Sequence, residues 1–197
     1  IDYVEYDEEY MKPFDLSIHK SLIVKGAMGK GKTTQIIKII NDNPDATVIC
    51  ISSRQKFAIS MCSEMNSKIK SEEIKCYLEK KVNFDSNRLF ISMESLHKLK
   101  NRIKLFDILI IDECESAFTQ LSSKTMGDKC SESYSILEQL IKEAKIKIYA
   151  DAFISNRTFS FVKTLDVSKK IYINNISKPV KRIARFVDGT LSSLFGE

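Results

Sequence analysis

Residues 26–34 read Gly26-Ala27-Met28-Gly29-Lys30-Gly31-Lys32-Thr33-Thr34 and follow the apolar run Leu22-Ile23-Val24. The pattern G-x-x-x-x-G-K-[ST] between a strand and a helix is typical of a phosphate-binding loop. Its glycines let backbone N–H groups turn towards a phosphate, because a Cβ would obstruct the approach. Lys32 would reach the β- and γ-phosphates, and the Thr33 hydroxyl would bind Mg²⁺. We therefore expect residues 26–34 to bind ATP together with Mg²⁺.

The segments around this loop alternate between strand and helix patterns. Candidate strands lie at 21–25, 47–51, 88–92, 106–111, 147–150 and 170–173, and candidate helices at 32–41, 54–68, 94–99, 113–121 and 134–144. Continuous apolar strands separated by helices are typical of a parallel sheet that is covered on both faces. The chain is therefore predicted to be an α/β protein with a central, mostly parallel sheet flanked by helices.

Three segments are expected along the chain. Residues 1–20 begin acidic and tyrosine-rich and contain Pro13, so they are predicted to be an irregular lead-in packed on the domain. Residues 21–174 are predicted to form the domain itself, with a loop rich in Ser, Lys and Gly at 122–133. Residues 175–197, which include Pro179 and several basic residues, are predicted to lead out of it.

Composition narrows the class of protein. A chain of 197 residues with 43% hydrophobic content can bury the core of one ordinary domain. The net charge of +5 permits a nucleic-acid partner without requiring one. No apolar stretch approaches the roughly 20 residues of a membrane-spanning helix, and no signal-peptide pattern opens the chain. We therefore expect a soluble, intracellular protein without a membrane partner. The five cysteines include no C-x-x-C pair, which argues against a disulfide framework and a structural zinc site.

A second motif, Ile108-Leu109-Ile110-Ile111-Asp112-Glu113, ends an apolar run in adjacent carboxylates. A buried strand would hold both acids at the edge of the sheet where the phosphate loop lies. Asp112 is then predicted to bind Mg²⁺ with Thr33, and Glu113 to act as the general base on the attacking water. Taken alone, the two acids are equally compatible with a capped helix start. Because they follow a phosphate loop, they favour an NTPase with Lys32, Asp112 and Glu113 as its catalytic residues.

At Asp112-Glu113-Cys114-Glu115, the chain resembles superfamily 2 helicases, whose DEAD or DEAH box occupies this position. More specifically, it resembles the herpesvirus-type replication origin-binding protein family, which is found also in large DNA viruses. The resemblance covers most of the chain and rests on the stretches at 25–34, 52–58, 92–97, 111–116, 120–126, 149–153 and 156–158. It implies a RecA-like P-loop NTPase domain, the first of two in a motor that moves along DNA.

The resemblance also implies roles for residues outside the ATP site. Contacts with a DNA strand would come from Ser53 and Arg54 in motif Ia and from Ser92 and Ser95 near motif Ib. Coupling of the ATP site to DNA would involve Glu115 and Asp151. Simple helix capping is the alternative for Arg54 and for both serines near motif Ib. The residues at 114 and 115 also depart from the commoner boxes, so coupling through them stays open.

For the full-length protein, the resemblance implies an ATP-dependent DNA helicase that acts in viral DNA replication. It would couple ATP hydrolysis to translocation or unwinding on a single strand or fork, with other replication proteins as partners, in the host cytoplasm or nucleus. In this class the second RecA-like domain supplies an arginine finger. We expect that second domain to lie outside residues 1–197, so the chain alone should bind ATP and hydrolyse it very weakly.

Two alternatives remain open from the sequence. A thymidine-kinase-like phosphotransferase also combines a Gly-Met phosphate loop with a strand ending in Asp-Glu, but the cysteine spacing here offers no zinc-bound lasso. Formation of thymidine monophosphate would identify that enzyme. The other alternative is a non-enzymatic DNA- or partner-binding module with a retained nucleotide fold. ATP binding and function would then both survive Lys32→Ala.

Overall fold

The computed structural model describes residues 1–53, 55–100, 104–123 and 126–178. Its centre is an eight-stranded sheet in the order β1-β8-β2-β7-β6-β3-β5-β4, in which every pair of neighbouring strands is parallel. The strands are β1 (Asp2–Tyr6), β2 (Ser21–Gly26), β3 (Val48–Ser52), β4 (Lys75–Cys76), β5 (Arg88–Ser92), β6 (Ile108–Asp112), β7 (Ile146–Asp151) and β8 (Lys170–Asn175). The predicted parallel α/β architecture is therefore confirmed.

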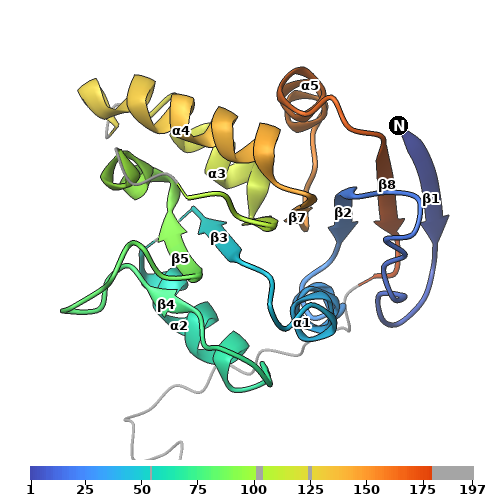
Figure 1. Ribbon diagram of the computed structural model, residues 1–197. Helices are drawn as coiled ribbons and strands as arrows, with labels where there is room; N and C mark the ends of the chain where they lie inside the picture. The colour runs from blue at the N-terminus through green and yellow to red at the C-terminus, as the bar shows by residue number, and fades with distance from the viewer. Residues whose placement is uncertain (54, 101–103, 124–125, 179–197) are drawn as a thin grey trace, which may run out of the picture.

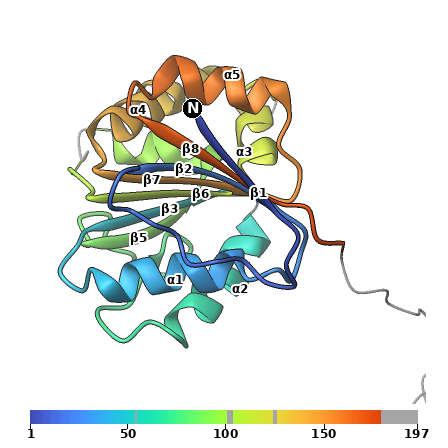
Figure 2. The ribbon, with the colours of Figure 1, turned by 90° about the vertical axis from the view of Figure 1, so that its right-hand side faces the viewer.

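Helices cover both faces of the sheet. They are α1 (Lys32–Asp42), α2 (Gln55–Asn66), α3 (Cys114–Gln120), α4 (Cys130–Glu143) and α5 (Asn156–Leu165), with the 3₁₀ helices η1 (Met93–Leu99) and η2 (Gly127–Lys129). Figures 1 and 2 show α1 and α2 on one face and α3, α4 and α5 on the other. This three-layer arrangement explains why the central strands are apolar along their whole length.

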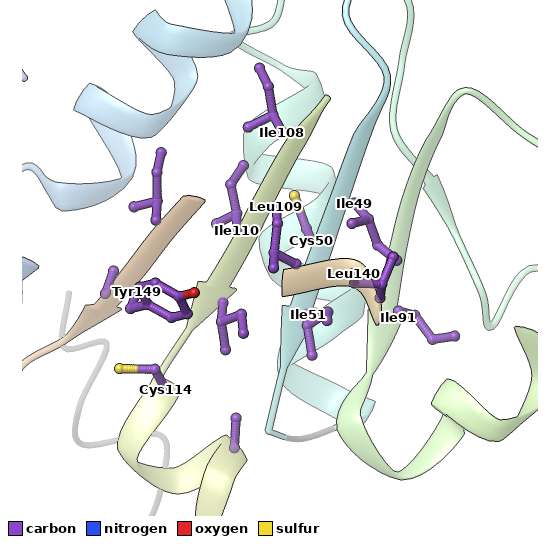
Figure 3. Packing of buried hydrophobic residues seen from close by; sticks show 14 of the residues in the cluster. Ile49, Cys50, Ile51, Ile91, Ile108, Leu109, Ile110, Cys114, Leu140 and Tyr149 are labelled. Carbon is purple, nitrogen blue, oxygen red and sulfur yellow. The ribbon is translucent and has the colours of Figure 1, made fainter. Parts of the chain in front are cut away.

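The core runs through the central strands. All five residues of β3 and of β5 are buried, as are the first four of β6. Figure 3 shows how Ile108, Leu109 and Ile110 of β6 lie beside Cys50 of β3 and Tyr149 of β7. Because these strands are held from both sides, the residues at their ends have fixed positions.

The lead-in at residues 1–20 differs from the prediction at its start. Residues 2–6 form strand β1, which pairs in parallel with β8 at the edge of the sheet, with Asp2 opposite Ile171. The prediction of an irregular segment was wrong there because β1, with the sequence Asp-Tyr-Val-Glu-Tyr, includes two acidic residues and is mostly exposed. The sequence therefore contains no apolar run that would predict this strand.

Other helices and strands also differ from the prediction in their limits. Helix α4 begins at Cys130, inside the predicted loop at 122–133. The prediction missed this start because the first turn of the helix is polar and lacks apolar periodicity. Helix α5 and the short strand β4 were not predicted. Strand β8 extends to Asn175, and most of the predicted exit segment lies outside the described residues. Within the described ranges, none of the helices combines the length and hydropathy that crossing a membrane requires.

Candidate functional site

The parallel strands bring the predicted site residues to one edge of the sheet. Strand β2 leads into the phosphate loop, while β6 and β7 end at Asp112 and Asp151. In the register of the sheet, Lys25 lies opposite Asp151 and Asp112 opposite Ala150. A cavity of about 440 Å³ opens at this edge, and we call it the sheet-edge cavity. It is lined by Met28, Gly29, Lys30, Gly31, Lys32, Thr33, Thr34, Met61, Glu64, Asp112, Glu113, Asp151 and Ala152.

The phosphate loop has the backbone that its sequence predicts. Gly29 and Gly31 adopt φ values of 78° and 84°, in the left-handed region that glycine enters without a steric penalty. The Lys32 ammonium donates hydrogen bonds to the carbonyl oxygens of Gly26 and Ala27, the latter at 3.2 Å. Burial lowers the pKa of Lys32, and the negative charge of Asp112 opposes that shift. The lysine is therefore held inside the loop, beside the acids.

Two residues to which the sequence analysis assigned no role, Met11 and Ser177, contact the outside of this loop. The Met11 N–H donates to the Lys30 carbonyl at 2.7 Å, and the Gln35 amide donates to the Met11 carbonyl at 3.2 Å. A Cβ at position 26 would collide with the end of the Met11 side chain, so Gly26 permits this packing. Lys30 donates to the Ser177 hydroxyl at 3.0 Å. Met11 and Ser177 lie in no recognisable motif, and no sequence signal marks them.

Asp112 is the expected metal ligand, and its environment is unusual for a carboxylate. Burial raises its pKa to about 6, against the opposing effects of the Glu113 backbone N–H and the Lys32 charge. Thr33 and Asp112 line the same cavity and offer the oxygen donors that Mg²⁺ prefers. Among the described residues, no three His, Cys, Asp or Glu side chains gather as a metal site. One carboxylate and one hydroxyl nevertheless fit Mg²⁺, which commonly completes its shell with phosphates and water.

Glu113 lies at the turn between β6 and α3 in a strained conformation. Its φ of 50° is the single positive value among the described non-glycine residues, and such strain costs on the order of 1 kcal/mol or more. The Ser53 hydroxyl donates a hydrogen bond to Glu113 Oε2 at 2.8 Å. Backbone strain of this kind clusters at functional sites, and here it falls on the predicted general base.

Glu115 and Asp151, the two predicted coupling residues, are in direct contact. The Glu115 N–H donates to Asp151 Oδ2 at 2.9 Å. The Glu115 carboxylate accepts hydrogen bonds from the Ser155 N–H at 3.0 Å, from the Arg157 guanidinium at 2.6 Å and from the Thr158 hydroxyl. Burial would raise the pKa of Glu115, but these donors outweigh it and lower the pKa to about 2. Glu115 therefore joins the end of β7 to the first turn of α5.

The residues expected to bind a DNA strand lie mostly in the interior. Ser53 is 2% exposed and faces Glu113. Ser92 and Ser95, at the carboxyl end of β5 and in η1, are also buried. Arg54 lies outside the described residues. All three serines are therefore buried as whole residues and present almost no surface to a DNA strand.

Comparisons with known proteins identify the family and the fold. The sequence model of the family described as "Origin of replication binding protein" matches residues 9–177. The replication origin-binding protein of Human herpesvirus 6A (strain Uganda-1102) is 32% identical over 142 residues, which cover 71% of this chain and 17% of that protein. A putative replication origin-binding protein of Acanthamoeba polyphaga mimivirus is 28% identical over 177 residues, covering 83% of this chain and 22% of that protein. The chain thus spans about a fifth of the length of these relatives.

Solved structures show the same fold at low sequence identity. A hypothetical ATP-dependent RNA helicase from Sulfolobus tokodaii superposes with a TM-score of 0.59 at 17% identity, over 78% of this chain and 48% of that one. A DEAD box protein from Methanococcus jannaschii gives a TM-score of 0.57 at 13% identity, over 79% of this chain and 45% of that one. The fold is therefore RecA-like, as predicted. With the family match over residues 9–177, the chain belongs to the origin of replication binding protein family.

Proposed function

We propose that this chain is the first RecA-like, ATP-binding motor domain of a DNA helicase that acts in viral DNA replication. The observation that carries the proposal is the sheet-edge cavity, where the phosphate loop meets Asp112 and Glu113. The relatives' names, which describe replication origin-binding proteins, support DNA as the partner. The RecA-like helicase fold supports ATP as the ligand.

The residues of the cavity would have different roles in ATP hydrolysis. Backbone N–H groups of the phosphate loop and the Lys32 ammonium bind the phosphates. Thr33 and Asp112 would hold Mg²⁺, which neutralises negative charge on the phosphates when it is bound. Glu113 orients the attacking water and accepts its proton. ATP and Mg²⁺ binding also places positive charge beside Asp112, which favours the ionised form of a carboxylate whose pKa burial has raised.

The link to DNA is proposed to run through two places at the same edge of the sheet. Contacts to the DNA strand are proposed at the segments that contain Ser53, Arg54, Ser92 and Ser95, which follow strands β3 and β5. The contact between Glu115 and Asp151 would couple those contacts to the ATP site. A second RecA-like domain of the full-length protein and other replication proteins are the expected partners, in the cytoplasm or nucleus of the host cell.

The test is a DNA-stimulated ATPase and unwinding assay on the full-length parent. We expect Lys32→Ala to abolish ATP binding, and Glu113→Gln to retain binding while losing hydrolysis. The isolated chain should bind ATP but hydrolyse it very weakly, because the arginine finger is expected in the second domain. ATPase activity that survives Lys32→Ala would refute the assignment of the cavity. Fast DNA-stimulated turnover by the isolated chain would refute its dependence on a second domain.

A further inference from the structure

We propose that Ser53 is a positioning residue for the general base, holding the Glu113 carboxylate in the orientation that hydrolysis needs. The inference rests on the proposed function, because it assigns a role within the same ATP site. It gives Ser53 a task different from the strand contact that the family resemblance implies. The next three observations support it.

The first observation is the contact itself. Strands β3 and β6 are neighbours, with Ile51 opposite Ile111, so the residues just beyond both strands meet at the edge of the sheet. There the Ser53 hydroxyl donates to Glu113 Oε2 at 2.8 Å. Ser53 is 2% exposed, so water competes little for this hydrogen bond. A bond to an ionised acceptor in such a place is among the stronger ones in proteins.

The second observation is the backbone of Glu113. Its left-handed φ of 50° gives the side chain a direction that an ordinary helix start would not give. A strained residue persists only where its surroundings hold it in place. The Ser53 hydroxyl supplies such a restraint from the neighbouring strand. It engages Oε2, one of two carboxylate oxygens, and accepting a proton from water requires only one.

The third observation is the position of Ser53 along the chain. It lies between β3 and α2, and Met61 and Glu64 of α2 line the sheet-edge cavity together with Glu113. The contact with a DNA strand that the family resemblance implies for residues 53 and 54 would lie at this same connection between β3 and α2. Ser53 itself is too buried to touch DNA, but a strand bound beside this connection would lie close to the hydrogen bond between Ser53 and the general base. That hydrogen bond therefore offers a path from a bound strand to the hydrolytic water.

The test compares Ser53→Ala and Ser53→Thr in the full-length parent, with ATP and a saturating single-stranded oligonucleotide. Losing a hydrogen bond to a partly buried carboxylate should lower kcat about tenfold. KM for ATP should stay within about twofold, because Ser53 lines no part of the cavity. Ser53→Thr keeps the hydroxyl and should restore kcat. Ser133→Ala removes another fully buried serine, on α4, and should leave kcat unchanged.

Three kinetic results would overturn the proposal. These are an unchanged kcat for Ser53→Ala, a raised kcat, which would mean that the hydrogen bond from Ser53 hinders the base, and a loss that Ser53→Thr does not restore. Amide hydrogen exchange of residues 113–116 provides a readout that needs no hydrolysis. It should be several-fold faster in Ser53→Ala than in wild type or Ser133→Ala, and unchanged exchange would also overturn the proposal. If wild type shows no ATPase sensitive to Lys32→Ala, the proposed function fails, and hydrogen exchange still decides whether Ser53 holds Glu113.

Discussion

Replacing Asp112 by Asn should stabilise the ligand-free protein at neutral pH, although it should abolish hydrolysis. Burial raises the pKa of this carboxyl from 3.8 to about 6, so the folded state pays to keep it ionised. An amide of the same shape removes that charge. Such a gain is expected where a site is built for a ligand rather than for stability.

The size of the effect follows from the pKa. A change from 3.8 to about 6 corresponds to about 3 kcal/mol at pH 8. Asp112 keeps part of its surface exposed, and water screens part of that cost, so we expect Asp112→Asn to gain about 1–2 kcal/mol. Because the folded-state pKa is raised, the stability contributed by Asp112 is greatest below pH 3.8 and is lost as the pH rises through about 6. The gain should therefore be about half as large at pH 5 as at pH 8.

The measurement is urea unfolding of wild type and Asp112→Asn at pH 5 and pH 8, with EDTA and without nucleotide. Asp107, just before the other end of the same strand, provides a matched control with the opposite sign. Its pKa is lowered to about 2, first by the Lys145 ammonium and then by hydrogen bonds from Thr47. Stability from a lowered pKa is present above pH 3.8 and is lost as the pH falls through about 2. Asp107→Asn should therefore lose about 1 kcal/mol at both pH values.

The reasoning fails if Asp112→Asn is no more stable than wild type at pH 8. It also fails if the gain is the same at pH 5 and pH 8, because the titration of the carboxyl would then not be its source. Adding Mg²⁺ and ATP should reduce the difference by stabilising wild type alone. Equal stabilisation of both proteins would show that Asp112 does not hold the metal.

Three further substitutions test the scaffold of the site. Glu115→Gln weakens the ionic anchor of α5 and should cost about 1–2 kcal/mol in urea unfolding at pH 7. Arg88→Met leaves the carbonyl oxygens of Pro44 and Glu72 without their buried donor and should cost about 3 kcal/mol by the same measurement. Gly29→Ala adds a Cβ at a φ of 78° in open space; it should cost about 1 kcal/mol and weaken ATP binding measured by titration calorimetry.

The central part of the site could be predicted because its signals are local. The phosphate loop and the apolar strand ending at Asp112 are short, dense patterns, and parallel strands necessarily end at one edge. The Ser53 contact could not be predicted in the same way. It joins residues 60 positions apart, and its existence depends on the left-handed backbone of Glu113. A single sequence does not reveal that conformation, because glutamate rarely adopts it.

The elements that were missed share a physical cause. Strand β1 pairs with β8, whose residues lie almost at the other end of the chain, and it exposes both faces. Hydrophobic periodicity, the main signal for a strand, is absent from such an edge. Helix α5 begins with polar residues, and its first turn is held by the carboxylate of Glu115 from α3. Both elements therefore depend on partners that are distant in the sequence.

That anchoring bears on the coupling through Cys114 and Glu115, which the sequence left open. Cys114 is fully buried, so the turn after Glu113 is fixed on one side by packing. Glu115 fixes the other side with two sets of bonds, its N–H to Asp151 and its carboxylate to the first turn of α5. A change in the orientation of Glu113 on ATP binding would have to move one of these two anchors, because Cys114 and Glu115 directly follow Glu113 in the chain. We therefore expect α5 and the end of β7 to respond to nucleotide, with Glu115 carrying the coupling by charge.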